Sequence, residues 1–155
     1  MTHYTSFERQ PNGLYYFFGH PAQLLNKTSP RTIRSNPIGV LCCKYTGAVH
    51  ESEGYDPNVH VFLQFENKGI SIRDGSELEA PRLHGISGCG IWRLCTFTNN
   101  EVSKLDGGKL RLVAVQHSAL HGRYVRGTRI ESIQSLIVQA FPDLKRAMEL
   151  GYPPA

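Results

Sequence analysis

Residues 83–92 read LHGISGCGIW, which places Ser87 between Gly85 and Gly88 just before an apolar stretch. Glycine adopts backbone angles that other residues resist, so a serine between glycines can sit on a sharp turn. In such a loop two backbone N–H groups can point at one position beside the hydroxyl and hold the oxyanion of a tetrahedral intermediate. The segment therefore predicts an acyl-transfer nucleophile at Ser87.

Short runs of strand-forming residues, separated by turn signals, surround this segment on both sides. The expected strands are 14–18, 38–45, 60–65, 91–97, 110–117 and 124–130. After them the apolar period changes to that of a helix, with Ser132 as the expected N-cap. Pro142 is expected to break that helix or to begin a second one. Many short strands at close spacing predict an all-β barrel or sandwich that carries a C-terminal helix.

The remaining segments are predicted as a tail and loops. Residues 1–13 are polar and end in a Pro-Asn-Gly turn signal, so we expect a polar N-terminal tail. The polar stretch 23–36 is expected to be a loop or an irregular strand. One domain then covers residues 14–150, which agrees with the chain length of 155 residues.

The order of these elements resembles the second, C-terminal barrel of the trypsin-like (chymotrypsin-fold) serine peptidases. That barrel has a strand ending in Gly-aromatic-Pro, a G-x-S-G nucleophile loop, a V-G-V-x-S strand, a Y-x-R-x-x-x-I strand and a closing helix. This chain has GHP at 19–21, GISG at 85–88, VAVQHS at 113–118 and YVRGTRI at 124–130. The resemblance implies an all-β, six- to seven-stranded antiparallel Greek-key barrel with a C-terminal α-helix.

The resemblance also implies roles for residues near the serine. Ser87 would be the nucleophile, and the N–H groups of Gly85 and Ser87 would form the oxyanion hole. The substrate-binding residues would be Pro81, Gln116, His117 and Ser118, of which the last three lie on a strand that pairs with the substrate backbone. Because Pro81 stands where trypsin has an acid, the resemblance does not imply a preference for Lys or Arg.

A base and an acid that orients it are missing from this pattern. In the family both come from the first barrel, and only residues 1–13 precede the first expected strand. His84, three residues from Ser87, and His117, across the barrel mouth, are the candidate bases within the chain. Without a base the Ser87 hydroxyl is a weak nucleophile. We therefore expect the nucleophile-bearing half of a serine endopeptidase-like hydrolase, which cleaves peptide bonds through an acyl-enzyme but is inactive or incomplete alone.

Several interpretations stay open, and whether the chain is an enzyme is undecided. The chain is a truncated product, or its partner barrel lies on another chain, or it is a non-catalytic module that binds an extended peptide by strand addition. An unrelated all-β fold with an accidental match at Ser87 is the remaining alternative. Cys89 invites comparison with cysteine peptidases of the same fold, but Ser87 holds the nucleophile position. The expected partners are a peptide or protein substrate, and a partner barrel or self-association through an exposed apolar face.

Composition argues against several other functions. The net charge is +4, but Lys and Arg are scattered along the chain, so we do not expect nucleic-acid binding. The four cysteines contain no CxxC pair, so we expect free thiols, no metal and no cofactor. No apolar run is long enough to span a membrane. The N-terminus also lacks the pattern of a secretory signal, so a cytoplasmic location is expected.

Overall fold

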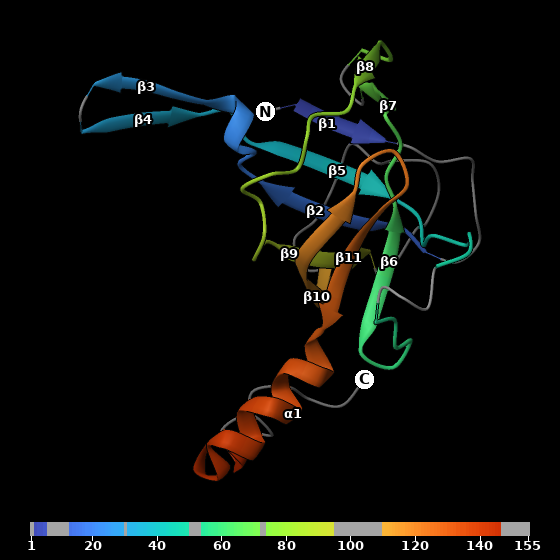
Figure 1. Cartoon of the computed structure of the whole chain (residues 1–155), viewed down its shortest axis with the longest axis vertical. Helices are drawn as coiled ribbons and strands as arrows, with labels where there is room; N and C mark the ends of the chain where they lie inside the picture. Colours follow the sequence, from blue (N-terminus) through green and yellow to red (C-terminus); the bar gives the residue numbers. More distant parts are fainter. Residues whose placement is uncertain are drawn as a thin grey trace.

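The computed structural model describes residues 2–5, 13–29, 31–49, 54–71, 74–94 and 110–146, with the backbone alone for 2–5. Within these ranges the chain is mostly β, and one α-helix lies near its C-terminal end (Figure 1). In chain order the elements are β1 (Thr2–Thr5), β2 (Tyr15–Gly19), η1 (Ala22–Leu24), β3 (Leu25–Ser29), β4 (Thr32–Ser35), β5 (Ile38–Cys42), β6 (His60–Gln64), β7 (Lys68–Ser71), β8 (Glu77–Glu79), β9 (Gly90–Leu94), β10 (Leu110–Leu120), β11 (Tyr124–Arg129), α1 (Ile130–Ala140) and η4 (Pro142–Leu144).

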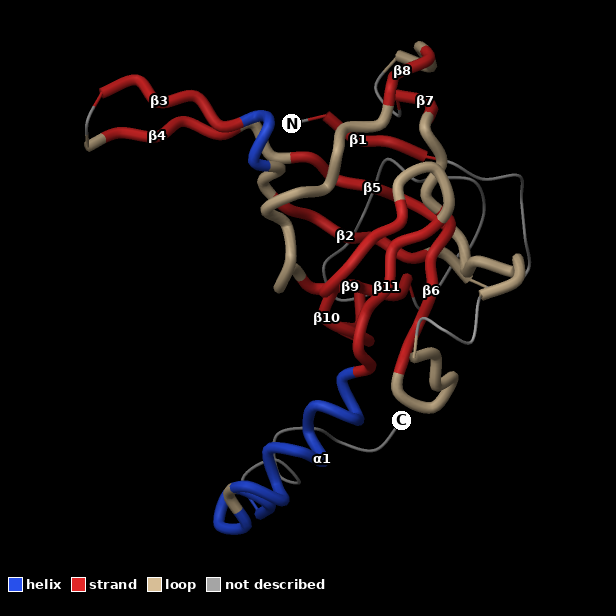
Figure 2. The backbone as a smooth tube through the Cα atoms, in the orientation of Figure 1, coloured by secondary structure: helices blue, strands red, loops and turns tan. Residues whose placement is uncertain are grey.

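Six strands form a curled antiparallel half-barrel in the order β6-β11-β10-β9-β2-β5 (Figure 2). They are the six strands predicted from the sequence, although the part of 91–97 beyond Leu94 lies outside the described residues. The segment after β5 returns to β6, where Tyr45 N–H donates to the Phe62 carbonyl at 2.9 Å and Gln64 N–H donates to the Cys43 carbonyl at 2.9 Å. Residues 43–45, which follow β5, are therefore hydrogen-bonded to β6 at this point.

The apolar core lies inside this curl. Side chains from all six strands meet there, because alternate residues of a strand point to the same face. Its buried strand residues are Phe17, Ile38, Val40, Cys42, Val61, Leu63, Ile91, Ala114 and Val125. Full burial of one large apolar side chain stabilises a fold by about 1.5–3 kcal/mol, so this cluster accounts for a large share of the driving force.

Two mostly polar segments form strands that the sequence pattern does not predict. Thr2–Thr5, within the segment expected to be a tail, forms β1 and pairs in parallel with β5. The stretch 23–36, expected to be a loop or irregular strand, contains the two-stranded β3–β4 ribbon. The side chains of this ribbon are almost all exposed, so no apolar alternation marks it. Strands β7 and β8 continue the main sheet beyond β1.

The helix α1 follows β11 directly. Arg129 is its N-cap residue, so the prediction of Ser132 as N-cap is wrong. Ser132 lies in the first turn, where its hydroxyl donates to the Asn58 carbonyl at 3.5 Å. The prediction for Pro142 is confirmed, because α1 ends before it and Pro142 opens η4.

Only the first residues of α1 contact the sheet, and the rest of the helix extends away from it (Figure 1). No side chain of α1 is buried, and Leu136 and Phe141 are 63% and 62% exposed. None of the described helices combines the length and the apolar character that crossing a bilayer requires.

Candidate functional site

Two consecutive β-turns carry Ser87, and they share Ile86. In the first turn Ile86 N–H donates to the Leu83 carbonyl at 3.3 Å. In the second turn Cys89 N–H donates to the Ile86 carbonyl at 3.1 Å. Ser87 is therefore the second residue of the second turn, a position from which its exposed side chain leaves the loop.

A glycine is the third residue of each turn. Gly85 has a φ of +89° and Gly88 a φ of +93°. A positive φ at this position is the mark of a type II turn and favours glycine strongly. The spacing of the two glycines in the Gly-x-Ser-Gly pattern therefore has a direct structural reason.

The first turn is anchored to the end of β2. Ile86 is 2% exposed and packs on Gly19, where an added Cβ would lie 2.9 Å from the Ile86 Cβ. Ala22 N–H also donates to the His84 carbonyl at 2.7 Å. Gly19, the last residue of β2, therefore leaves room for Ile86. Residues 83–89 are called the serine loop from here on.

The second turn is anchored to β10. Gly88 N–H donates to the Gln116 carbonyl at 2.7 Å, and Gln116 N–H donates to the Cys89 carbonyl at 2.9 Å. With both ends bonded to strands of the half-barrel, Ser87 has a fixed position relative to β10.

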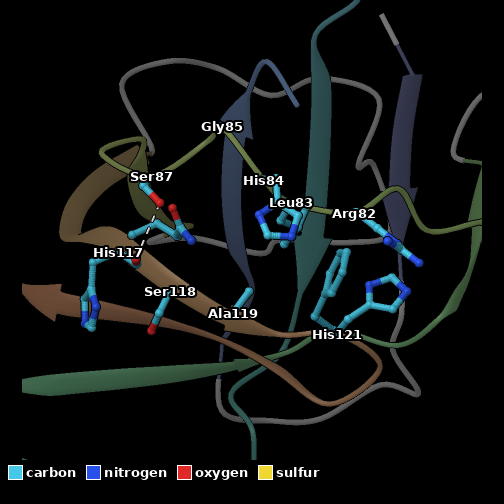
Figure 3. Close-up of a pocket in the computed structure, with 11 residues that line it drawn as sticks. Arg82, Leu83, His84, Gly85, Ser87, His117, Ser118, Ala119 and His121 are labelled. Atoms are coloured by element: carbon cyan, nitrogen blue, oxygen red, sulfur yellow. Dashed lines mark hydrogen bonds between the residues drawn. The ribbon is translucent and has the colours of Figure 1, made fainter. Parts of the chain in front are cut away.

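The hydroxyl of Ser87 donates to the backbone carbonyl of His117 at 3.4 Å (Figure 3). His117 has no register partner in β11, because β10 bulges between Gln116 and Ser118. An extra residue at a bulge changes the direction of the backbone groups. The bulge therefore accounts for a His117 carbonyl that faces the serine loop.

The imidazole of His117 points away from Ser87 (Figure 3) and packs against the His60 ring, with ring centroids 5.6 Å apart. Burial lowers the pKa of His117 below its usual value, and the charge of Arg126 and the neighbouring His60 ring lower it further. The ring is therefore neutral near pH 7. It is not placed to take a proton from the Ser87 hydroxyl in this conformation.

The other candidate base, His84, lies in the first turn of the same loop. Its carbonyl accepts the bond from Ala22, and its side chain is exposed. Within the described residues Ser87 Oγ bonds to no imidazole. A catalytic role for Ser87 would therefore need a base from elsewhere or a different conformation.

The two amides expected to form an oxyanion hole have no acceptor. Among the described residues, neither Gly85 N–H nor Ser87 N–H donates a hydrogen bond. Both belong to the rigid loop that carries the hydroxyl. They are thus available to a ligand oxygen at that loop.

A pocket of about 520 Å³ opens beside Ser87 (Figure 3). The predicted site residues that line it are His84, Gly85, Ser87, Gln116, His117 and Ser118. Pro81 is buried and does not line the pocket. Arg82 and His121 also line it, and no sequence motif marked either residue. Within the described ranges, three or more metal-ligating side chains do not gather anywhere.

Gln116 stands out among the lining residues because it is only 2% exposed. Its side-chain Oε1 has no hydrogen-bond partner in the described part of the protein. A buried, unpaired carbonyl oxygen costs about 1–3 kcal/mol. A ligand bound in the pocket could supply the hydrogen-bond donor that Gln116 Oε1 lacks among the described residues.

Cys89 does not compete with Ser87 as a nucleophile. Burial raises the pKa of the Cys89 thiol to about 11, a shift that a backbone hydrogen bond at Phe18 only partly opposes. The thiol is therefore protonated near pH 7, whereas the thiolate is the reactive form.

Searches of protein families, curated proteins and solved structures found no match to this chain. Its function therefore has to be inferred from the chemistry of the serine loop and its pocket. That loop combines a hydroxyl, two available amides and a concave surface large enough for a side chain.

Proposed function

We propose that this chain is the nucleophile-bearing barrel of a serine peptidase of the trypsin-like type. The observation that carries the proposal is the loop at Ser87, where a hydroxyl and the N–H groups of Gly85 and Ser87 share two adjoining turns beside a pocket. The hydrogen bonds between the segment after β5 and β6 support a Greek-key barrel for the six antiparallel strands.

The proposed reaction is acyl transfer. A base takes the proton of Ser87 Oγ as the oxygen attacks the peptide carbonyl, and the carbonyl electrons move to its oxygen. The N–H groups of Gly85 and Ser87 stabilise that oxyanion. Loss of one such donor costs about 3 kcal/mol of transition-state stabilisation in measured enzymes. The C–N bond then breaks, the base returns its proton to the leaving amine, and water later hydrolyses the acyl-enzyme.

A partner barrel would supply the base and the acid. The Ser87 hydroxyl donates a hydrogen bond to a backbone carbonyl. A carbonyl oxygen accepts a hydrogen bond but does not take up the proton at neutral pH. A rotation about the Cα–Cβ bond of Ser87 would release the hydroxyl to an imidazole that approaches from the open side. The chain would therefore show little hydrolytic activity until the partner barrel is bound. A second copy of this chain that places a base beside Ser87 would have the same effect.

Chemical rescue tests this proposal. The full chain is incubated with a fluorophosphonate probe with and without added imidazole, and the labelled site is read by mass spectrometry in the tryptic peptide 83–93. We expect slow labelling at Ser87 that rises with imidazole concentration and is absent in Ser87→Ala. Ser135→Ala, which removes an exposed hydroxyl on α1 outside the pocket, is the matched control and should keep the labelling. Labelling elsewhere, or none at Ser87 at any imidazole concentration, contradicts the proposal.

A non-catalytic peptide-binding module is the second candidate. The observation that favours it is β10, which continues to Leu120, four residues past Gln116, the last residue whose backbone N–H and carbonyl both bond to the serine loop. An extended peptide could add to that free edge. Peptide binding that is unchanged in Ser87→Ala, together with no rescue by imidazole, would favour this function over hydrolysis.

A further inference from the structure

The pocket beside Ser87 carries charge of one sign. Its lining includes the guanidinium of Arg82 and the side chains of His84 and His121 (Figure 3), and none of the described lining residues is an acid. Arginine keeps its proton at every pH that proteins experience. Arg82 has no ion-pair partner in the described parts of the chain. At neutral pH the pocket therefore holds a positive charge that no ion pair among the described residues balances.

The guanidinium of Arg82 lies at the opposite end of the pocket from Ser87 (Figure 3). One wall runs back along the loop from Ser87 to Arg82, and the other follows β10 and its turn from His117 to His121. Figure 3 shows Ser87 and His117 together at one end, with Arg82 and His121 together at the other. A peptide whose backbone lies at Ser87 would thus direct a side chain along the pocket toward Arg82.

Gln116 adds a hydrogen-bonding group along the same path. Its buried side chain lines the pocket and makes no hydrogen bond within the described residues. A carboxamide offers two donors from its NH₂ end and an acceptor from its oxygen. In the observed orientation the unpaired Oε1 can accept a hydrogen bond from an N–H group of the bound peptide.

We infer that this pocket takes the side chain of an acidic residue, glutamate or aspartate, from the peptide ligand. The inference rests on the proposed function, because it places the ligand backbone at Ser87. A lysine or arginine side chain would meet Arg82 with no carboxylate to compensate. An apolar side chain would remove water from Arg82 and Gln116 without pairing either group, which is unfavourable.

Direct binding of short peptides tests the inference without any need for catalysis. The full chain carrying Ser87→Ala, which cannot cleave its ligand, is titrated by calorimetry with acetyl-Ala-Ala-Ala-Xaa-amide, where Xaa is Glu, Gln or Lys. We expect the Glu peptide to bind about fivefold more tightly than the Gln peptide, the scale of one exposed ion pair, and the Lys peptide to bind most weakly. Raising the salt concentration should reduce the preference for Glu.

Variants of Arg82 test whether the preference for the Glu peptide arises in this pocket. In the same background Arg82→Gln should abolish the difference between Glu and Gln, and Arg82→Lys should keep part of it. Arg31→Gln changes the net charge equally at the exposed turn between β3 and β4 and should leave the preference intact. Equal or tighter binding of the Gln or Lys peptide, a preference that survives Arg82→Gln, or no binding of any peptide overturns the inference. Imidazole-dependent labelling of Ser87 reports separately on the proposed function, so the two can fail independently.

Discussion

The hydroxyl of Ser87 is hydrogen-bonded to the carbonyl oxygen of His117 at 3.4 Å, while the His117 imidazole is turned toward His60. His117 thus contacts Ser87 through its backbone and not through its ring. A carbonyl holds the hydroxyl in one orientation but does not raise its nucleophilicity. This relationship explains why the chain is expected to need a base from outside.

Removing either candidate imidazole should therefore change little. We expect His117→Ala and His84→Ala to alter the imidazole-rescued labelling of Ser87 by no more than about twofold, because neither ring accepts its proton. General-base catalysis typically contributes about 10²–10⁴-fold. A loss of that size in either variant would identify that histidine as the base and refute the partner-supplied base.

Gly88→Ala should destabilise the protein through the backbone alone. A Cβ at Gly88 meets nothing within 4 Å, but its φ of +93° is unfavourable for alanine. We expect the free energy of unfolding to fall by about 1–2 kcal/mol, measured by urea denaturation. Gly88→Asn should lose less, because asparagine tolerates positive φ better. Equal losses in the two variants would show that φ is not the cause.

Gly19→Ala tests the contact between β2 and the serine loop. Its added Cβ would lie 2.9 Å from the Ile86 Cβ, so the loop has to move. We expect a loss of about 1–3 kcal/mol in urea denaturation, as for other overpacked sites. The double variant with Ile86→Gly, which removes the Ile86 Cβ as well, should destabilise the protein by less than the sum of the two single losses. Strict additivity would mean that the two residues are not coupled.

Cys89 should be unreactive at mildly alkaline pH. Burial raises its pKa from 9.0 to about 11, so the thiol stays protonated until the pH approaches 11. At pH 8 we expect iodoacetamide to modify Cys89 about a hundredfold more slowly than in the urea-unfolded chain, because a shift of two pKa units lowers the thiolate fraction by that factor. The tryptic peptide 83–93 reports on this cysteine alone. A rate that already levels off near pH 9 would contradict the raised pKa.

The strands of the half-barrel could be predicted because their buried residues form short apolar runs, as in the fully buried β5, or alternate with polar residues between turn signals. The turns at Gly85 and Gly88 could be predicted because a positive φ leaves few alternatives to glycine. Strand β1 and the β3–β4 ribbon could not be predicted in this way, since they are held by backbone pairing and carry polar side chains.

The charged end of the pocket could not be predicted for a different reason. Arg82 and His121 lie 39 positions apart and belong to no local pattern. They line one pocket because the hydrogen bonds of Gln116 with Gly88 and Cys89 hold the serine loop against β10. Such a pair becomes visible only when the register of the strands is known.

The most direct test of the account is the response of two backbone amides to an oxyanion analogue. Ser87 is labelled with the fluorophosphonate in the presence of imidazole, and the ¹⁵N-labelled chain is compared by NMR before and after modification. We predict that the amide protons of Gly85 and Ser87 both shift downfield, because the phosphoryl oxygen becomes their shared acceptor. Unchanged shifts for Gly85, in an adduct confirmed at Ser87, would contradict the claim that this loop stabilises an oxyanion.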